Sequence, residues 1–138
     1  MIIRSFEKDD WKKITEPIET GAVDIDDNQL DMLTSRGIAI TVEDEMGVVG
    51  CGGTFFYDDC NAELWIRLAK RVELKTMSIV DSICAGIKIL TSMPDVKFYC
   101  RVRDGFRKGE KLAKWLGFKK IENHTVVDGV RYDTYILL

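Results

Sequence analysis

The middle of this chain alternates apolar and polar residues with two different periods, which predict a strand, a helix and a second strand. Residues 62–70 alternate with a period of two, as in a half-buried β-strand. Residues 75–93 repeat apolar positions three and four apart, which predicts the longest helix, ended by Pro94. Residues 96–103 alternate again with a period of two. This order predicts a right-handed crossover between two parallel strands.

The same periods, and the turn residues between them, divide the rest of the chain into short elements. Further strands are predicted at residues 1–6, 38–45, 47–57, 119–127 and 130–138, and further helices at residues 7–19, 28–37 and 105–116. Asp128-Gly129 favours a two-residue hairpin between the last two strands. The predicted fold class is α/β (α+β), with a mixed, mostly antiparallel central sheet of about seven strands and helices on both faces. Residues 1–138 are predicted to form a single domain.

Residues 103–123 combine a short amphipathic helix, a stop signal and a strand. The apolar positions lie at helical spacing: Phe106, Leu112, Ala113 and Leu116. Asp104 can cap the first turn by accepting a backbone hydrogen bond. Gly117 can take the left-handed conformation that ends a helix, and Phe118 can fold back onto the last turn.

Other local signals concern the first half of the chain. Pro17 disturbs the last turn of the first predicted helix, and Asp26 or Asp27 can cap the second helix. The interior of the strand at residues 47–57 contains Gly50, Gly52 and Gly53. Glycines inside a strand indicate a bulge or a close approach by other backbone.

Composition and charge narrow the function classes. The chain has 138 residues, of which 46% are hydrophobic, enough for one packed core. A net charge of −3 gives no overall attraction for nucleic acid or an acidic membrane. No apolar run approaches the roughly 20 residues that span a bilayer, and the N-terminal segment turns acidic too early for a signal peptide. We therefore expect a cytoplasmic protein.

The four cysteines do not follow a metal-binding pattern. None belongs to a C-x-x-C pair, and His124 is the only histidine, so no metal site is predicted. Cys84 and Cys100 fall within a helix and a strand pattern, which favours reduced thiols that pack as small hydrophobes. A Cys–His nucleophile pair is the alternative, and no local motif supports it.

The order of elements and the motifs at both ends resemble the GNAT superfamily of acyl-CoA-dependent N-acyltransferases. The opening IIRSFEKDDWKKI resembles the family's first strand, which ends in Arg before an acidic helix start. KLAKWLGFKKI resembles its helix-Leu-Gly-Phe-strand ending. The resemblance covers nearly the whole chain and is clearest from Ala62 to Phe118. That segment also looks like the degenerate GNAT-like proteins of tailed phages.

The resemblance implies a site for acetyl-CoA between two splayed strands, residues 62–70 and 96–103. In the family, the pantetheine arm lies between these strands, and the pyrophosphate binds at the N-terminus of the next helix. Carried over residue by residue, the resemblance implies these cofactor-binding positions: Leu68, Ala69, Lys70, Leu74, Lys75, Thr76, Met77, Ser78 and Phe106. Acetyl-CoA is the implied co-substrate.

The pyrophosphate loop departs from the family pattern. Leu74 and Thr76 stand where the family usually has glycines, which let phosphate approach backbone N–H groups closely. Lys70, Arg71 and Lys75 can partly replace these contacts as point charges. Weaker or repositioned cofactor binding is the physical expectation.

The last helix departs as well. Phe106 and Ala113 stand where the family often has an Asn and the Tyr that protonates the departing thiolate. Substitute donors by residue type are Tyr99, Tyr57, Tyr135 and Cys100. We take Tyr99 as the candidate acid.

Glu63 is the candidate general base, because it lies early on the first splayed strand. Asp58 and Asp59 are the next candidates, and a solvated strand-end carboxylate is the non-catalytic alternative for Glu63. Arg67 and Arg101 lie within strand patterns, where a charge requires a partner. Each either points into the cleft or forms a structural ion pair, for instance with an acidic residue of the first two helices.

Two hypotheses follow. The first is an acetyltransferase that moves an acetyl group from acetyl-CoA to an amine acceptor, either a protein or a small molecule. The alternative is a catalytically inactive GNAT-fold binding or structural protein, such as a phage component. Nucleic acid and membrane partners are disfavoured, and a homodimer through the last strands is expected by analogy.

Overall fold

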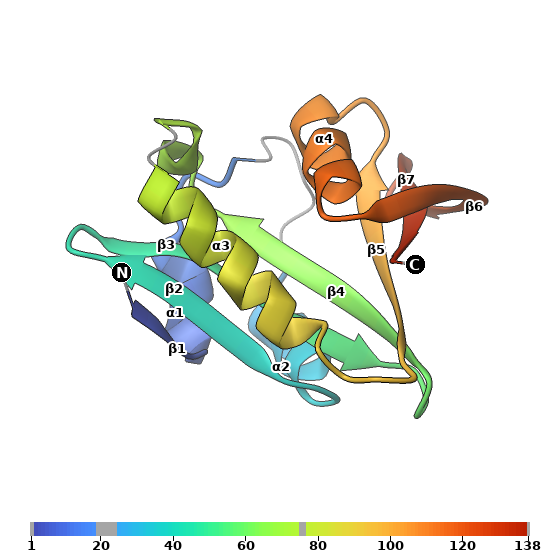
Figure 1. Ribbon diagram of the computed structural model, residues 1–138, viewed down its shortest axis with the longest axis horizontal. Coiled ribbons are helices and arrows are strands. Elements are labelled where there is room, and N and C mark those ends of the chain that lie inside the picture. Colours follow the sequence, from blue (N-terminus) through green and yellow to red (C-terminus); the bar gives the residue numbers. More distant parts are fainter. Residues whose placement is uncertain (1, 19–24, 75–76, 138) are drawn as a thin grey trace.

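The computed structural model describes residues 2–18, 25–74 and 77–137, with the backbone alone at residues 73–74 and 77–79 (Figure 1). Seven strands form one sheet in the order β1-β2-β3-β4-β5-β7-β6. The strands are β1 (Ile2–Ser5), β2 (Ala39–Asp44), β3 (Gly47–Phe56), β4 (Asn61–Leu68), β5 (Lys97–Arg103), β6 (Phe118–Val127) and β7 (Val130–Leu137). β4 and β5 are parallel, and the other neighbouring pairs are antiparallel. The predicted mixed, mostly antiparallel sheet is confirmed.

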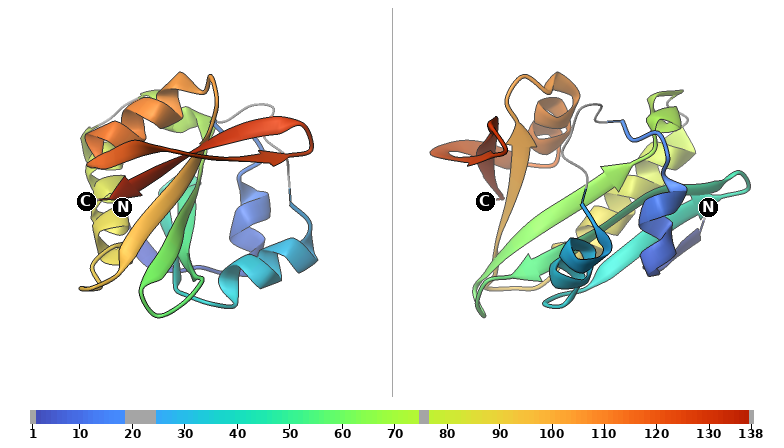
Figure 2. Two further views of the ribbon diagram at one scale, coloured as in Figure 1. Left: turned by 90° about the vertical axis from the view of Figure 1, so that its right-hand side faces the viewer. Right: turned by 180° about the vertical axis from the view of Figure 1, so that it is seen from behind.

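Helices cover both faces of the sheet, as predicted. The helical elements are α1 (Lys8–Lys13), α2 (Asp27–Thr34), the short 3-10 helix η1 (Lys70–Leu74), α3 (Met77–Leu90) and α4 (Arg107–Trp115). The left view of Figure 2 shows α1 and α2 on one face of the sheet, and α3 and α4 on the other. α3 forms the crossover that joins β4 to its parallel neighbour β5.

The alternation of β4 divides the core into two layers. Leu64 and Leu68 pack with Ile83 and Ile87 of α3. Trp65 points to the opposite face, where it packs with residues in or directly after β1, α1 and β3: Phe6, Trp11, Ile14 and Cys51. The period of two predicted from the sequence therefore places one face of β4 under each pair of helices.

Several local predictions are confirmed. Asp26 caps α2 by accepting a hydrogen bond from the Gln29 N–H at 2.8 Å. Gly117 ends α4 with a φ of 95°. The interior glycines of β3, Gly50, Gly52 and Gly53, meet close neighbours; a Cβ on Gly53, for example, would lie 2.6 Å from the Ile38 carbonyl oxygen. A register shift between Val42 and Glu43 on the partner strand marks the bulge.

Two helix boundaries were predicted wrongly. The first helix, expected over residues 7–19, ends at Lys13, and Pro17 lies in an extended bridge with Ala69. Proline has no N–H to continue the helical ladder, so the chain leaves the helix before it. Asp104 does not cap α4, because the N-cap is Phe106 and no side chain bonds there.

A buried carboxylate ties the first strand to the first helix. Asp10 is fully buried and accepts hydrogen bonds of 2.8 Å from the Arg4 guanidinium, the Thr41 hydroxyl and the Glu7 N–H. Burial alone would raise the pKa of Asp10. The hydrogen bonds, with Arg4 first, outweigh burial and hold that pKa well below its usual range.

Candidate functional site

β4 and β5 separate after three paired residues. Their parallel register runs from Asn61↔Lys97 to Glu63↔Tyr99 and ends there. Beyond this point the two strands diverge, as Figure 1 shows, with α4 beside the wide end. A cleft of about 400 Å³ occupies the gap and includes residues of both strands. The predicted splay is therefore present in the structure.

The backbone of β4 points into this gap at alternate residues. The Ala69 N–H donates to Val49 of β3, while the Leu68 carbonyl turns the other way. With a period of two, Leu64 and Ile66 direct their N–H and C=O groups to the same side as Leu68, toward β5. The strand therefore presents a row of backbone hydrogen-bonding groups along the cleft.

A short segment after α1 occupies the end of that row. The Ile18 N–H donates to the Leu68 carbonyl at 2.9 Å, and the Lys70 N–H donates to the Glu16 carbonyl at 2.8 Å. Sequence reasoning did not foresee this pairing, because Pro17 only signalled a disturbed helix. Cofactor binding at Leu68, Ala69 and Lys70 stays a prediction. At Leu68 and Lys70 it requires these two hydrogen bonds to be exchanged.

The predicted pyrophosphate region follows β4 directly. Leu74 ends η1, and Met77 and Ser78 open α3, whose N-terminus lies beyond the end of β4 (Figure 1). The predicted positions Lys75 and Thr76 lie outside the described residues, so these assignments stay predictions.

Arg71, expected from the sequence to act as a point charge near the phosphates, is paired with a carboxylate in the structure. Two of its nitrogens donate to the Asp44 carboxylate at 2.7 Å each, and one also donates to the Gly47 carbonyl at 3.1 Å. Arg71 therefore ties η1 to the β2–β3 turn.

The carboxylate of Glu63 lies at the narrow end of the cleft and is buried. Arg101 of β5 donates to its Oε2 from Nε at 3.0 Å and from Nη2 at 2.8 Å. The Tyr57 hydroxyl donates to its Oε1 in a short hydrogen bond. The partner of Arg101 is thus the candidate base itself, rather than an acidic residue of the first two helices. Glu63 and Arg101 lie 38 residues apart in sequence, so the periodicity of the sequence could not show that they pair.

The predicted acid, Tyr99, is paired in register with Glu63, but its hydroxyl turns away from the cleft. It donates to the Asn61 side-chain oxygen at 3.3 Å. Tyr132 does line the cleft, and sequence reasoning did not single it out. Tyr132 pairs with Arg103 on β5, so its position depends on the order of β5 and β7 in the sheet. The alternation of residues 130–138 was the only sequence signal for it.

α4 supplies an apolar wall to the cleft. Leu112 and the two cap residues of the helix, Phe106 and Leu116, line it, and cofactor binding at Phe106 stays a prediction. Gly109 makes room for the Phe106 ring, because a Cβ there would lie 2.6 Å from the ring. Cys100 also lines the cleft, and burial raises the pKa of its thiol to about 12. The thiol is therefore neutral near pH 7.

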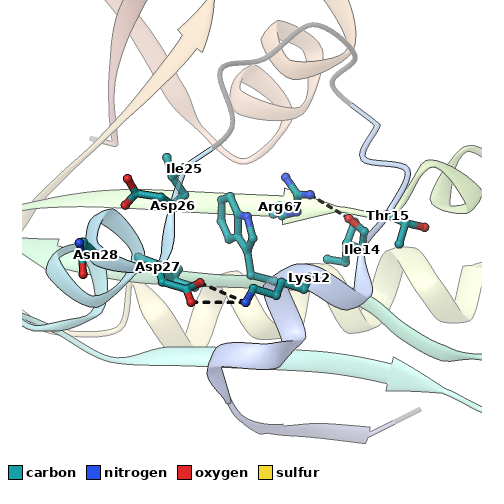
Figure 3. Close-up of a pocket in the computed structure, with 10 residues that line it drawn as sticks. Lys12, Ile14, Thr15, Ile25, Asp26, Asp27, Asn28 and Arg67 are labelled. Atoms are coloured by element: carbon teal, nitrogen blue, oxygen red, sulfur yellow. Dashed lines mark hydrogen bonds and ion pairs between the residues drawn. The ribbon is translucent and has the colours of Figure 1, made fainter.

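A second hollow of about 710 Å³ lies between α1 and α2 (Figure 3). It meets the cleft at three shared residues, Trp11, Ile25 and Arg67. The Arg67 guanidinium stacks 4.5 Å from the Trp11 ring centroid and donates to the Ile14 carbonyl at 2.8 Å. Figure 3 also shows Lys12 paired with Asp27 at the rim, at 3.2 Å. The three shared residues therefore form a wall common to the hollow and the cleft.

Solved structures of other proteins share this architecture, whereas sequence comparisons find no match. No protein-family model matches the chain, and no curated protein matches it by sequence at a significant level. A mutant of the spermidine N-acetyltransferase SpeG from Vibrio cholerae superposes with a TM-score of 0.70 at 16% identity, covering 100% of this chain and 95% of that one. The chain has the GNAT fold.

Two further structures share this fold. The IAA acetyltransferase from Bacillus cereus matches with a TM-score of 0.71 at 13% identity, covering 99% of this chain and 97% of that one. A GNAT family acetyltransferase from Elizabethkingia anophelis, solved with acetyl-CoA bound, matches with a TM-score of 0.62 at 11% identity, covering 88% and 95%. The expected GNAT architecture is thus confirmed. The narrower resemblance to phage proteins stays a prediction.

In the described part of the chain, no helix is both long and apolar enough to cross a membrane. Within the same residues, His, Cys, Asp and Glu side chains form no group of three that could hold a metal ion. Cytoplasmic location, a homodimer and the lack of nucleic acid binding stay predictions.

Proposed function

We propose that this protein transfers an acetyl group from acetyl-CoA to an amine. The observation that carries the proposal is the cleft between β4 and β5 with the Glu63 carboxylate on its wall. A thioester lying along β4 would meet backbone N–H groups, and an amine beside Glu63 would meet a base. The GNAT fold, shared with acetyltransferases, supports the same chemistry.

The chain's own residues fit two roles in this reaction. The backbone N–H of Ile66, beyond the last β4–β5 pair, polarises the thioester carbonyl from the cleft side of β4. Glu63 takes a proton from the attacking ammonium. The nitrogen bonds to the carbonyl carbon and the carbon–sulfur bond breaks. Of the two protons that the nitrogen loses, one ends on the thiol of CoA and the other leaves through Glu63.

The acceptor approaches from the α1–α2 face. The hollow there adjoins the cleft across Trp11 and Arg67 and has the volume of a small-molecule site, which is typically about 300–1,000 Å³. The spermidine N-acetyltransferase among the structural neighbours is named for a small amine, so spermidine is a suitable first probe.

Binding of acetyl-CoA is the first test. We expect acetyl-CoA and CoA to raise the melting temperature with saturation in the micromolar range, whereas ATP should not. Phe106→Ala should weaken acetyl-CoA binding about tenfold, because the ring lines the cleft. Trp115→Ala is the matched control, since Trp115 is an α4 aromatic that is 64% exposed. No shift at millimolar acetyl-CoA would overturn the proposal.

Turnover is the second test. Release of CoA from acetyl-CoA in the presence of spermidine, compared with release to water alone, reports group transfer. Binding without any release of CoA would instead favour the inactive alternative.

A further inference from the structure

Glu63 connects the cleft to solvent through Tyr57. The Glu63 carboxylate lines the cleft, but its Oε1 accepts a hydrogen bond from Tyr57, which comes from the other side. Tyr57 follows β3 directly and is 51% exposed. A chain of two side chains therefore leads from the cleft, through a buried carboxylate, to the protein surface.

The turn between β3 and β4 fixes Tyr57 in this place. The Tyr57 N–H donates to the Asn61 carbonyl at 2.9 Å. Within the same turn, the Asp58 carboxylate accepts from the Cys60 N–H at 2.7 Å and from the Asn61 side chain at 3.0 Å. The Tyr57 ring also packs edge-to-face on Phe55, with centroids 5.3 Å apart. The hydroxyl is thus held toward Glu63 by backbone and ring contacts that do not involve the carboxylate.

Arg101 fixes the other oxygen of the carboxylate. Its Nε and Nη2 both donate to Oε2 of Glu63, which leaves the Oε1 side to Tyr57. A buried carboxylate needs such a partner, because an isolated charge is costly to desolvate. The fork of the guanidinium also sets the plane of the carboxylate, as a lysine ammonium could not.

We propose that Tyr57 is the outlet for the proton that Glu63 takes up during acetyl transfer, and that Arg101 is the positioning residue that aligns Glu63 between the cleft and Tyr57. This inference rests on the proposed function, since it assigns the route of the proton that the reaction must release. It adds a residue outside the cleft lining to the machinery of the reaction.

The relay conserves protons and restores each side chain. Glu63 accepts a proton from the ammonium, and the Tyr57 hydroxyl turns toward water. The carboxylic proton then passes to the phenol oxygen while the original hydroxyl proton passes to water. Burial and the neighbouring carboxylate raise the pKa of Tyr57 to about 12, so the phenol is neutral near pH 7 and does not rest as tyrosinate.

Buffer dependence of CoA release tests the outlet. The assay uses acetyl-CoA with spermidine as the probe amine, and with water as the only acceptor, at fixed pH and increasing imidazole. In Tyr57→Phe we expect kcat to fall about tenfold at low buffer, with an unchanged KM for acetyl-CoA. Imidazole should restore that rate, because a small base can replace the lost relay, and it should leave the wild type unaffected. An unchanged kcat, or a loss that no imidazole concentration restores, would overturn the outlet.

Arg101→Lys tests positioning. Lysine keeps the positive charge but cannot donate two parallel hydrogen bonds to the Glu63 carboxylate. We therefore expect kcat to fall, and imidazole should not restore it, because the carboxylate is misaligned. Arg36→Lys is the matched control, because the exposed Arg36 lies 5.9 Å from the Phe55 ring near the same turn and should leave kcat unchanged. An Arg101→Lys enzyme with wild-type kcat would overturn the positioning role.

The outcomes separate this inference from the proposed function. If the wild type releases no CoA, the proposed function fails. If it does and Tyr57→Phe is unchanged, only the relay fails. Ultraviolet titration of tyrosinate gives a readout without turnover: in Glu63→Gln the pKa of Tyr57 should fall from about 12. Identical titrations of wild type and Glu63→Gln would show that the two groups are not coupled, and would overturn the inference.

Discussion

Arg71 holds Asp44 through two hydrogen bonds of 2.7 Å and thereby fixes the segment that follows β4 onto the β2–β3 turn. The hydrogen bonds from Arg71 lower the pKa of Asp44. The side chains are only 25% and 20% exposed, so the pair is partly shielded from water. η1 precedes α3, the helix whose N-terminus is expected to meet the cofactor phosphates. The Arg71–Asp44 pair therefore anchors the segment that leads to this N-terminus.

A double-mutant cycle on this pair should show a coupling of about 1 kcal/mol in the free energy of unfolding, since a bidentate, partly buried pair exceeds an ordinary surface pair. The cycle uses Asp44→Asn and Arg71→Gln, with urea unfolding as the measurement. Lys8 and Asp31 form the control pair, with side chains 44% and 61% exposed, and should couple more weakly. Equal coupling in the two cycles would contradict the special role of the Arg71 pair.

The sequence predicted the scaffold because its signals are local. The alternation at residues 62–70 and 96–103, with a helical period between them, was enough to predict β4, α3 and β5. Asp26 and Gly117 marked helix ends for reasons that lie within one turn of the chain. These features depend on residues a few positions apart, and hydrophobic periodicity and capping signals are patterns over that distance.

The site was less predictable because its contacts are distant in sequence. Glu63 was found by its place on β4, but its partner Arg101 comes from the next strand. Tyr132 enters the cleft through the order of β5 and β7. The pairing of Glu16–Ile18 with the end of β4 depends on where α1 stops. Only the tertiary arrangement determines these relationships.

Asp10 should make stability depend on pH in the acidic range. Its pKa is lowered in the folded state, so its contribution is complete above the unfolded value of about 3.9 and is lost as the pH falls below that value. Asp10→Asn should lower the free energy of unfolding by about 2–4 kcal/mol at pH 7, because it leaves the hydrogen bonds of Arg4 and Thr41 unmatched. The difference in free energy of unfolding between wild type and this variant should become smaller toward pH 3.

Urea unfolding at pH 7 and pH 3 measures both effects. Asp9→Asn is the matched control on the same helix, since Asp9 is exposed, and it should change stability by less than about 0.5 kcal/mol. If the difference in free energy of unfolding between wild type and Asp10→Asn is the same at both pH values, the lowered pKa of Asp10 does not contribute to stability.

The same glycine-to-alanine change should have different effects at two sites. A Cβ at Gly53 would lie 2.6 Å from the Ile38 carbonyl and 2.7 Å from the Trp65 ring, so Gly53→Ala should cost about 2–3 kcal/mol. At Gly86 in α3 the nearest atom is the end of the Ile40 side chain at 3.1 Å, which can shift. Gly86→Ala also gains helix propensity, so its free energy of unfolding should lie within about 1 kcal/mol of the wild-type value. Thermal unfolding of both variants checks the contrast, and a similar loss at both sites would contradict it.

The cysteines should react with iodoacetamide in an order set by burial. Burial raises the pKa of Cys51 and Cys100 to about 12, so both stay as neutral thiols at pH 8, whereas Cys60 is exposed. The thiolate is the reactive species, so Cys60 should be alkylated first, with Cys51 and Cys100 slower by at least about tenfold. Peptide mass spectrometry over time gives the order, and urea-unfolded protein, in which all four should react alike, is the control. Rapid native labelling of Cys100 would contradict the raised pKa of its half-buried thiol.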